Sequence, residues 1–204
     1  MHGIEAFPTI RVVRDPMNTG TEPLRRAGVL MRLPKAPALV KRIGHGVLGS
    51  PKVQETVQWF RETLGFICSD DVYAGEKDNL IGSFNRCDRG DEYVDHHVFF
   101  CVRNERAGLS HLSFEVPDID AVFKDHEYLM KLGKYEHMWG VGRHLLGSQV
   151  YDYWADPWRR THERWADTDR LNAKSGSNLL PAHEALVSQW GEGPPERFLT
   201  RICP

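Results

Sequence analysis

Ile43-Gly44-His45-Gly46-Val47 lies in a strand-like run, residues 42–48, that opens the most regular part of the chain. Ser50 is predicted to cap a helix that has Pro51 at its first position and ends at Gly65. Apolar residues recur at helical spacing between these ends. Three further strands are predicted, at residues 66–73, 79–85 and 96–103. The stretch therefore predicts a unit of one strand, one helix and three strands.

The same order of elements then repeats. An apolar strand runs from His111 to Val116, and Asp118 is predicted to cap a helix that stops at Gly133. Three more strands are predicted, at residues 136–141, 149–154 and 160–165. This repeat predicts an α+β fold of two βαβββ modules, residues 41–104 and 109–167, in one domain of residues 41–170.

The two ends of the chain lack this regularity. Residues 1–40 are rich in proline and are expected to form an irregular lead segment, with one short strand at residues 29–31. Residues 171–204 are interpreted as a C-terminal extension, in which a helix is predicted at residues 181–190 and a tail from Pro194 onward.

The composition narrows the class of protein. The chain has 204 residues, of which 41% are hydrophobic and 26% charged, as in a globular protein. The formal net charge is -2, so the chain lacks the excess of basic residues that is typical of nucleic-acid binders. We therefore expect no nucleic-acid partner. We see neither an apolar run of about 18 residues nor a secretory leader, and we therefore expect no membrane partner and a cytoplasmic location. The four cysteines are too sparse for a disulfide framework, and Cys101 is expected in a buried strand.

Two histidines occupy equivalent places in the repeat. His45 and His111 lie on the first strand of each module, where pseudo-symmetry can bring equivalent strands together. Glu163, on the last predicted strand, can reach the same point, whereas His162 must face the other way in a regular strand. Two histidines and one carboxylate form the facial triad that holds Fe(II) and leaves coordination positions open. The alternative is structural histidines, because ten histidines make a chance triplet easy to assemble.

A family resemblance supports the metal site. Gly142-Arg143-His144, followed by Tyr153 and then Glu163, resembles the C-terminal signature of type I extradiol ring-cleavage dioxygenases. These enzymes belong to the vicinal oxygen chelate superfamily and include the 2,3-dihydroxybiphenyl and catechol 2,3-dioxygenases. Asp95-His96-His97 and the strand at 111–116 are also similar, and the resemblance covers roughly residues 40–170. The chain is most similar to one-domain members, although it has Arg159 where their loop usually has glycine.

The resemblance implies a function and a role for each site residue. The chain would cleave a catechol-type ring with O2 at a non-haem Fe(II), with Mn(II) as the other possible ion. His45, His111 and Glu163 would be the metal ligands in residues 41–170, the catalytic domain. His97 would be the acid or base beside the oxygen site, chosen over His96 because it is the second histidine of the matching pair. Strand alternation would send the two to opposite faces, so only one of them is expected to point in. His144 and Tyr153 would contact the substrate hydroxyls, and a homo-oligomer is expected.

Two other functions on the same fold stay open. A glyoxalase-like isomerase or lyase would use a fourth ligand on the last strand of the first module, where His97 is available. A non-enzymatic binder of small molecules, of the resistance-protein type, would need no metal triad. The identity of the catechol, the side of the diol that is cleaved and the pathway are not fixed by these residues.

Overall fold

The computed structural model describes residues 17–28 and 30–203. The chain divides into two compact units, Met1–Ala36 and Pro37–Pro204. The described residues of the first unit form turns, tied for example by a hydrogen bond from the Arg26 backbone N–H to the Asn18 side chain. The strand predicted at residues 29–31 is wrong for Leu30 and Met31, which form no strand, and Val29 lies outside the described residues.

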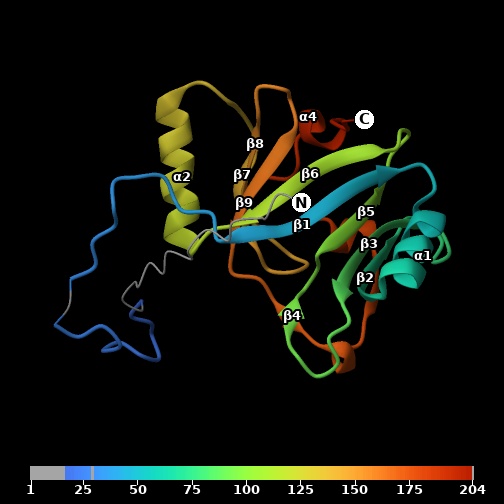
Figure 1. The fold of residues 1–204 in the computed structure, drawn as a ribbon, viewed down its shortest axis with the longest axis horizontal. Coiled ribbons are helices and arrows are strands. Elements are labelled where there is room, and N and C mark those ends of the chain that lie inside the picture. Colours follow the sequence, from blue (N-terminus) through green and yellow to red (C-terminus); the bar gives the residue numbers. More distant parts are fainter. Residues whose placement is uncertain (1–16, 29, 204) are drawn as a thin grey trace, which may run out of the picture. The chain divides into compact units, whose positions relative to one another are not determined.

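The second unit contains both predicted modules (Figure 1). The elements of the first are β1 (Arg42–Ser50), α1 (Val53–Leu64), β2 (Phe66–Tyr73), β3 (Leu80–Cys87) and β5 (Phe99–Arg103). Those of the second are β6 (Gly108–Glu115), α2 (Ile119–Leu132), β7 (Glu136–His144), β8 (Val150–Ala155) and β9 (Thr161–Ala166). The predicted order of two βαβββ modules is confirmed.

Smaller elements complete the described chain. The strands β4 (Val94–Asp95) and β10 (Arg170–Leu171) pair with each other. The C-terminal residues form η1 (Ala173–Ser175), β11 (Asn178–Pro181), α3 (Ala182–Ala185), β12 (Ser188–Trp190) and α4 (Glu196–Leu199). Within the described part of the chain, no helix combines the length and apolar character needed to cross a bilayer.

The two modules join edge to edge in one sheet. Among the described residues, ten strands follow the order β11-β2-β3-β5-β1-β6-β9-β8-β7-β12. Antiparallel pairing of β1 with β6 forms the junction, and each of these strands pairs in parallel with the last strand of its own module, β5 or β9. The first strands of both modules therefore lie side by side at the centre of the sheet.

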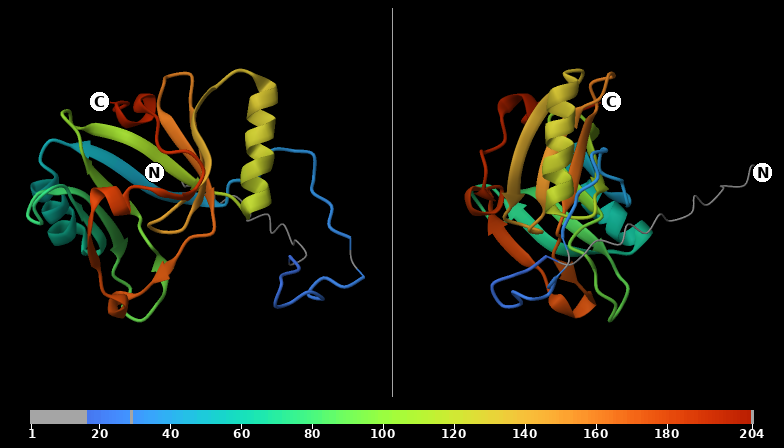
Figure 2. Two further views of the ribbon diagram at one scale, coloured as in Figure 1. Left: turned by 180° about the vertical axis from the view of Figure 1, so that it is seen from behind. Right: turned by 90° about the vertical axis from the view of Figure 1, so that its left-hand side faces the viewer.

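Each helix covers one face of its own module. Val53 and Val57 of α1 pack with Phe99 and Cys101 of β5. Similarly, Val122 of α2 packs in a buried cluster with residues of β8 and β9. Figures 1 and 2 show the two helices at opposite ends of the sheet. The other face of the strands is thereby left to line a cavity. Cys101 is fully buried, as predicted, and the four cysteines are free.

The helix ends show which capping signals are reliable. Asp118 caps α2 by accepting a hydrogen bond from the Ala121 N–H, and Gly65 and Gly133 end the two helices in the left-handed region, as predicted. The prediction that Ser50 caps α1 is wrong. The helix begins after Lys52, and Ser50 ends β1 instead, where its hydroxyl accepts the Lys52 N–H.

The helix predicted at residues 181–190 is also wrong, because long-range pairing overrides the local pattern. Only α3 is helical there, while β12 pairs with β7 at one edge of the sheet and β11 pairs with β2 at the other. An edge strand presents unpaired backbone groups, and covering it satisfies them. The C-terminal residues thus complete both edges of the sheet.

Gly44 permits the close approach of β1 to the Trp165 ring, because an added Cβ would lie 2.5 Å from Trp165 Nε1. We expect Gly44→Ala to lower the free energy of unfolding by about 1–3 kcal/mol through overpacking. Gly46→Ala is the matched control, since its Cβ would make only an ordinary 3.6 Å contact with Leu112. Urea denaturation of both variants checks this, and equal stabilities would contradict it.

Candidate metal centre

Two histidines and one glutamate meet where the modules join. His45 lies on β1, His111 on β6 and Glu163 on β9, and these three strands are neighbours in the sheet. Each residue offers one ligand atom within 4.8 Å of the others, and all three side chains are buried. Glu163 Oε2 lies 2.9 Å from His45 Nε2 and 3.7 Å from His111 Nε2. The structure thus brings together the three predicted ligands, whose role stays a prediction.

The unsatisfied atoms of this cluster fit a metal ion. Glu163 is fully buried, and neither of its oxygens has a partner at hydrogen-bonding geometry. His111 Nε2 is likewise buried without a partner. Buried polar atoms are rarely left unsatisfied, because each costs roughly 1–3 kcal/mol. Converging imidazole nitrogens and a carboxylate are donors that a divalent transition metal would satisfy together.

Charge in the cluster favours the protonation states that metal binding needs. Burial lowers the pKa of His111 to about 3, so its imidazole is neutral at ordinary pH. Burial alone would raise the pKa of Glu163. However, the facing histidines, His45 and His144 above all, hold it well below its usual range. A neutral imidazole and an ionised carboxylate are the forms that bind a metal.

His97 lies beside this cluster, with its ring centroid 4.2 Å from that of His45. The premise that strand alternation separates His96 from His97 is wrong, because both lie in an irregular link between β4 and β5 and both are buried. His96 Nδ1 is 3.0 Å from His97 Nδ1, and His96 Nε2 is 2.6 Å from Asp70. His97 lines the cavity, whereas His96 connects it to a carboxylate.

This chain of three side chains defines one tautomer for His97. The Asp70 carboxylate can only accept, so His96 Nε2–H donates to it. His96 Nδ1 is then an acceptor for the Nδ1–H of His97. His97 Nε2 is therefore the ring nitrogen left to take up a proton. Burial, together with repulsion from His45 and His96, holds the pKa of His97 well below its usual range.

His144 and Tyr153 face the same point from β7 and β8. His144 Nε2 lies 2.9 Å from the Tyr153 hydroxyl and 3.6 Å from Glu163 Oε1. Tyr153 pairs with Glu163 across β8 and β9, which puts both side chains on one face of the sheet. Burial and the Glu163 charge raise the pKa of Tyr153 well above its usual range, so its phenol stays protonated.

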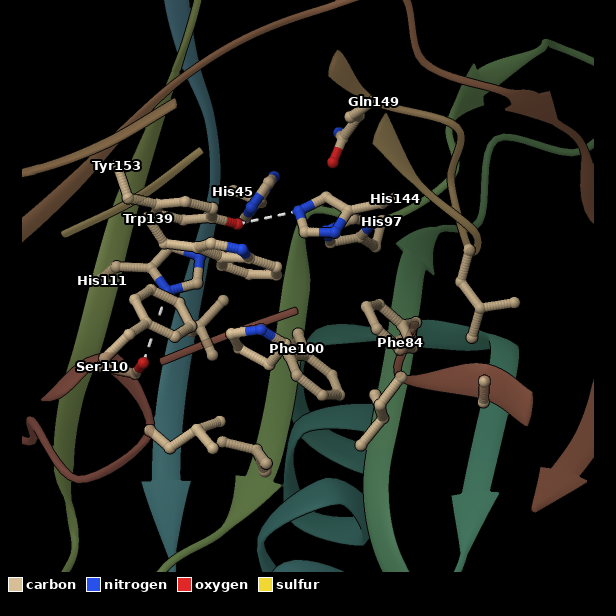
Figure 3. A pocket seen from close by; sticks show the side chains of 18 of the residues that line it. His45, Phe84, His97, Phe100, Ser110, His111, Trp139, His144, Gln149 and Tyr153 are labelled. Carbon is tan, nitrogen blue, oxygen red and sulfur yellow. Dashed lines mark hydrogen bonds between the residues drawn. The ribbon is translucent and has the colours of Figure 1, made fainter. Parts of the chain in front are cut away.

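A mostly apolar cavity of about 270 Å³ opens beside these residues (Figure 3). Phe84 and Phe100 line it from the first module, and Trp139 stacks parallel to Tyr153 with 5.2 Å between ring centroids. Its apolar wall includes Val47, Val102, Leu145, Leu146, Ala185, Leu186, Val187, Phe198, Leu199 and Ile202. Such a shape and lining suit a small aromatic molecule.

Two residues of this cavity were not among the site residues predicted from the sequence. Phe198 of α4 contacts the rings of His111, Trp139 and Tyr153. Gln149 is fully buried, and neither atom of its amide has a partner. Neither stands in a local motif, and Phe198 reaches the cavity only because the C-terminal residues fold back onto the sheet. The unpartnered amide is a polar group that a ligand can satisfy.

Comparison with known proteins agrees with this geometry. The chain is 30% identical over 188 residues to Metapyrocatechase 2 of Cupriavidus necator. The matched region covers 91% of this chain and 55% of that protein. It is similar in structure to the Mn(II)-bound glyoxalase from Novosphingobium aromaticivorans, with a TM-score of 0.64 and 25% identity over 78% of this chain and 50% of that one. An extradiol ring-cleaving dioxygenase from B. fuscum superimposes with a TM-score of 0.70 at 17% identity, covering 81% of this chain and 45% of that one. No protein-family model matches.

These likenesses define the class of protein. The chain has the vicinal oxygen chelate fold, as predicted from its sequence. Within that class, its resemblance to the extradiol dioxygenases is confirmed by the metapyrocatechase homologue. The chain spans about half the length of the relatives that it matches.

We expect Glu163→Gln to abolish tight binding of Mn(II) or Fe(II) at the His45–His111–Glu163 centre, since the amide keeps the shape of the side chain but removes the charge. The loss should exceed the roughly 10–100-fold that removal of an outer hydrogen-bond partner costs. Equilibrium dialysis with Mn(II) measures it. His162→Gln is the control, because His162 is next in sequence but faces away and contacts Asp156 instead. Unchanged affinity in Glu163→Gln would remove this residue from the ligand set.

Proposed function

We propose that the chain is an extradiol dioxygenase. It cleaves the ring of a catechol-type substrate next to the diol with O2, at a non-haem Fe(II) held by His45, His111 and Glu163, with Mn(II) as the alternative ion. When bound, the ion supplies neighbouring open positions for the diol and O2 and a path for electrons between them. The similarity to a metapyrocatechase supports this chemistry.

The observation that carries the proposal is the number of protein ligands. Each module places its histidine eight residues before the first residue of its helix, so His45 and His111 are equivalent. His111 pairs with Thr161, and Glu163 follows two residues later. The matching position in the first module is Phe100, because β1 pairs with β5 in the register Gly46↔Phe99. The first module thus offers no fourth ligand at that position, and coordination positions stay open for substrate and O2.

His144 and Tyr153 would bind and orient the diol. The protonated Tyr153 hydroxyl can donate a hydrogen bond to a deprotonated substrate oxygen, and His144 Nε2 lies within reach of the same atom. Because His144 and Tyr153 are in direct contact at 2.9 Å, the hydrogen bonding of one side chain can adjust to a change of charge on the other. Removal of a hydroxyl proton by a positioned side chain contributes typically 10²–10⁴-fold to a rate.

His97 would move a proton beside the candidate ligand His45, 4.2 Å away between ring centroids. Its Nε2 is free to accept or return a proton, while Asp70 and His96 hold the ring in one tautomer. The low pKa that burial imposes on His97 keeps it neutral until a negative charge develops nearby. Its role is that of a proton carrier rather than a metal ligand.

The cavity lining also points to a class of catechol. Phe84, Phe100 and Leu146 form part of the apolar wall, with Phe84 packed edge-on against the His97 ring at 5.0 Å, and Gln149 supplies an unpartnered amide. Figure 3 shows Phe84 and Phe100 displaced to one side of His45, His111 and Tyr153. A catechol carrying an apolar substituent fits this shape, with its diol at the histidines.

A glyoxalase-like isomerase is the second candidate, because the similarity to a Mn(II)-bound glyoxalase reaches 25% identity. Such an enzyme would need no O2. Phe100 at the position equivalent to Glu163 argues against its fourth ligand, and His97 has its Nδ1 engaged by His96.

We expect anaerobically Fe(II)-loaded protein to consume O2 when given catechols, with a substrate bearing an apolar ring such as 2,3-dihydroxybiphenyl turned over faster than unsubstituted catechol. An oxygen electrode and the absorbance of the yellow ring-fission product measure the two sides of the reaction. The Glu163→Gln protein is the control and should consume none. Isomerisation of a glutathione hemithioacetal without O2 uptake would instead establish the glyoxalase-like function.

We further expect His97→Phe to keep its metal but to lose turnover by about 10²–10⁴-fold, as for removal of a general acid or base. Metal content and O2 uptake are measured on the same preparation. His183→Phe, a change at an exposed histidine, is the control and should keep full activity. Full turnover in His97→Phe with metal retained would exclude His97 from the mechanism.

A further inference from the structure

A second group of two histidines and one carboxylate lies on the other face of the sheet. His126 comes from α2, His137 from β7 and Asp152 from β8. One ligand atom of each lies within 4.8 Å of the others. Because side chains alternate along a strand, Tyr151 and Tyr153 face the cavity while Asp152 faces α2. This group is therefore separate from the proposed catalytic centre.

The distances within this group match a metal site. His126 Nδ1 lies 3.2 Å from each oxygen of Asp152, and His137 Nε2 lies 2.8 Å from Oδ1. A tetrahedral ion with bonds of about 2.0–2.1 Å separates neighbouring ligand atoms by roughly 3.3 Å. Small changes in the distances between these three ligand atoms would thus place them at three corners of a tetrahedron around an ion.

The surroundings of Asp152 support the same interpretation. The side chain is fully buried, and Trp154 Nε1 donates to Oδ2 at 2.5 Å, which orients the carboxylate and leaves Oδ1 toward the histidines. Ligating carboxylates are commonly held by such an outer hydrogen bond. Across the strand pair lies Gly140, where a Cβ would come within 3.0 Å of Oδ1, so the glycine keeps the space around this oxygen open.

Access and local charge also allow an ion to bind. The side chains of His126 and His137 are 25% and 24% exposed, so an ion can enter from solvent and keep a water as its fourth ligand. Arg164 is paired with Asp152 across the strands, and Arg197 donates to the backbone carbonyl of His137 at 3.3 Å. Of these two, Arg164 is the one opposite the carboxylate. Its guanidinium is directed to Asp125, at 3.5 Å, and to the Phe114 ring.

We propose that His126, His137 and Asp152 form a second site for a divalent transition-metal ion, with Zn²⁺ the best match to two imidazoles and one carboxylate. The ion joins α2 to β7 and β8. Its role is structural, since the site lies on the face away from the cavity and all three ligands come from the second module.

The test is the zinc content of the full chain after chelation and equilibration with Zn²⁺, measured by atomic emission. The wild type should hold two ions per chain, His137→Gln one, and His45→Ala/His111→Ala one. His183→Gln, a change at an exposed histidine, is the matched control and should hold two. Two results would overturn the proposal. In the first, the wild type holds one ion per chain and His137→Gln also holds one. In the second, both proteins hold two ions per chain.

A stability measurement keeps the proposal testable if the doubly substituted protein folds poorly. In the Glu163→Gln background, free Zn²⁺ at 100 times its Kd should raise the melting temperature by about 5–10 °C. The same addition should leave the melting temperature unchanged when His126→Gln is also present. An equal rise in both proteins would place the stabilising ion elsewhere and reject this site.

Discussion

The antiparallel pairing of β1 with β6 is the constraint on which the rest of the structure depends. It sets His111 opposite Val47 and so brings the histidine strands of the two modules together. Parallel pairing of β6 with β9 then places Glu163 beside them. A one-residue slip in either register would turn every side chain of the strand to the other face. The position of the candidate ligands is therefore fixed by backbone hydrogen bonds rather than by loops.

The two modules share an architecture but not a chemistry. The second supplies the candidate ligands His111 and Glu163 together with His144 and Tyr153. The first supplies His45, His97 and an aromatic wall. At matching positions on the last strands the modules carry Phe100 and Glu163. This asymmetry has a physical consequence. Glu163 brings a charge to the centre, whereas Phe100 at the matching position can exclude water from an apolar substrate.

The sequence predicts the modules well because their signals are local. Glycines in the left-handed region end both helices, and Asp118 caps the second by its own side chain. The Ser50 cap fails because a hydroxyl after a strand can serve a neighbouring turn equally well. The elements after residue 170 resist prediction because long-range pairing determines them: β11 and β12 attach to opposite edges of the sheet.

The same distinction applies to the candidate site. His45 and His111 can be found from the repeat, since equivalent strands imply a shared position, and Glu163 from its place on the last predicted strand. His97 is found from the family resemblance, and the structure corrects only the expected strand alternation, because His96 and His97 lie in an irregular link. Phe198 emerges only when the C-terminal residues are placed in three dimensions, and the unpartnered amide of Gln149 only when the burial of its side chain is known.

Strand β8 shows how one short segment serves both faces of the module. Tyr151 and Tyr153 lie on the cavity side of the sheet, while Asp152 and Trp154 lie on the side of α2. The alternation along the strand therefore supplies side chains to both faces. A buried carboxylate on the outer face needs compensation, which the two histidines provide with or without an ion. Because Tyr153 follows directly after Asp152, the packing that holds α2 to the sheet also fixes the backbone that positions the Tyr153 hydroxyl.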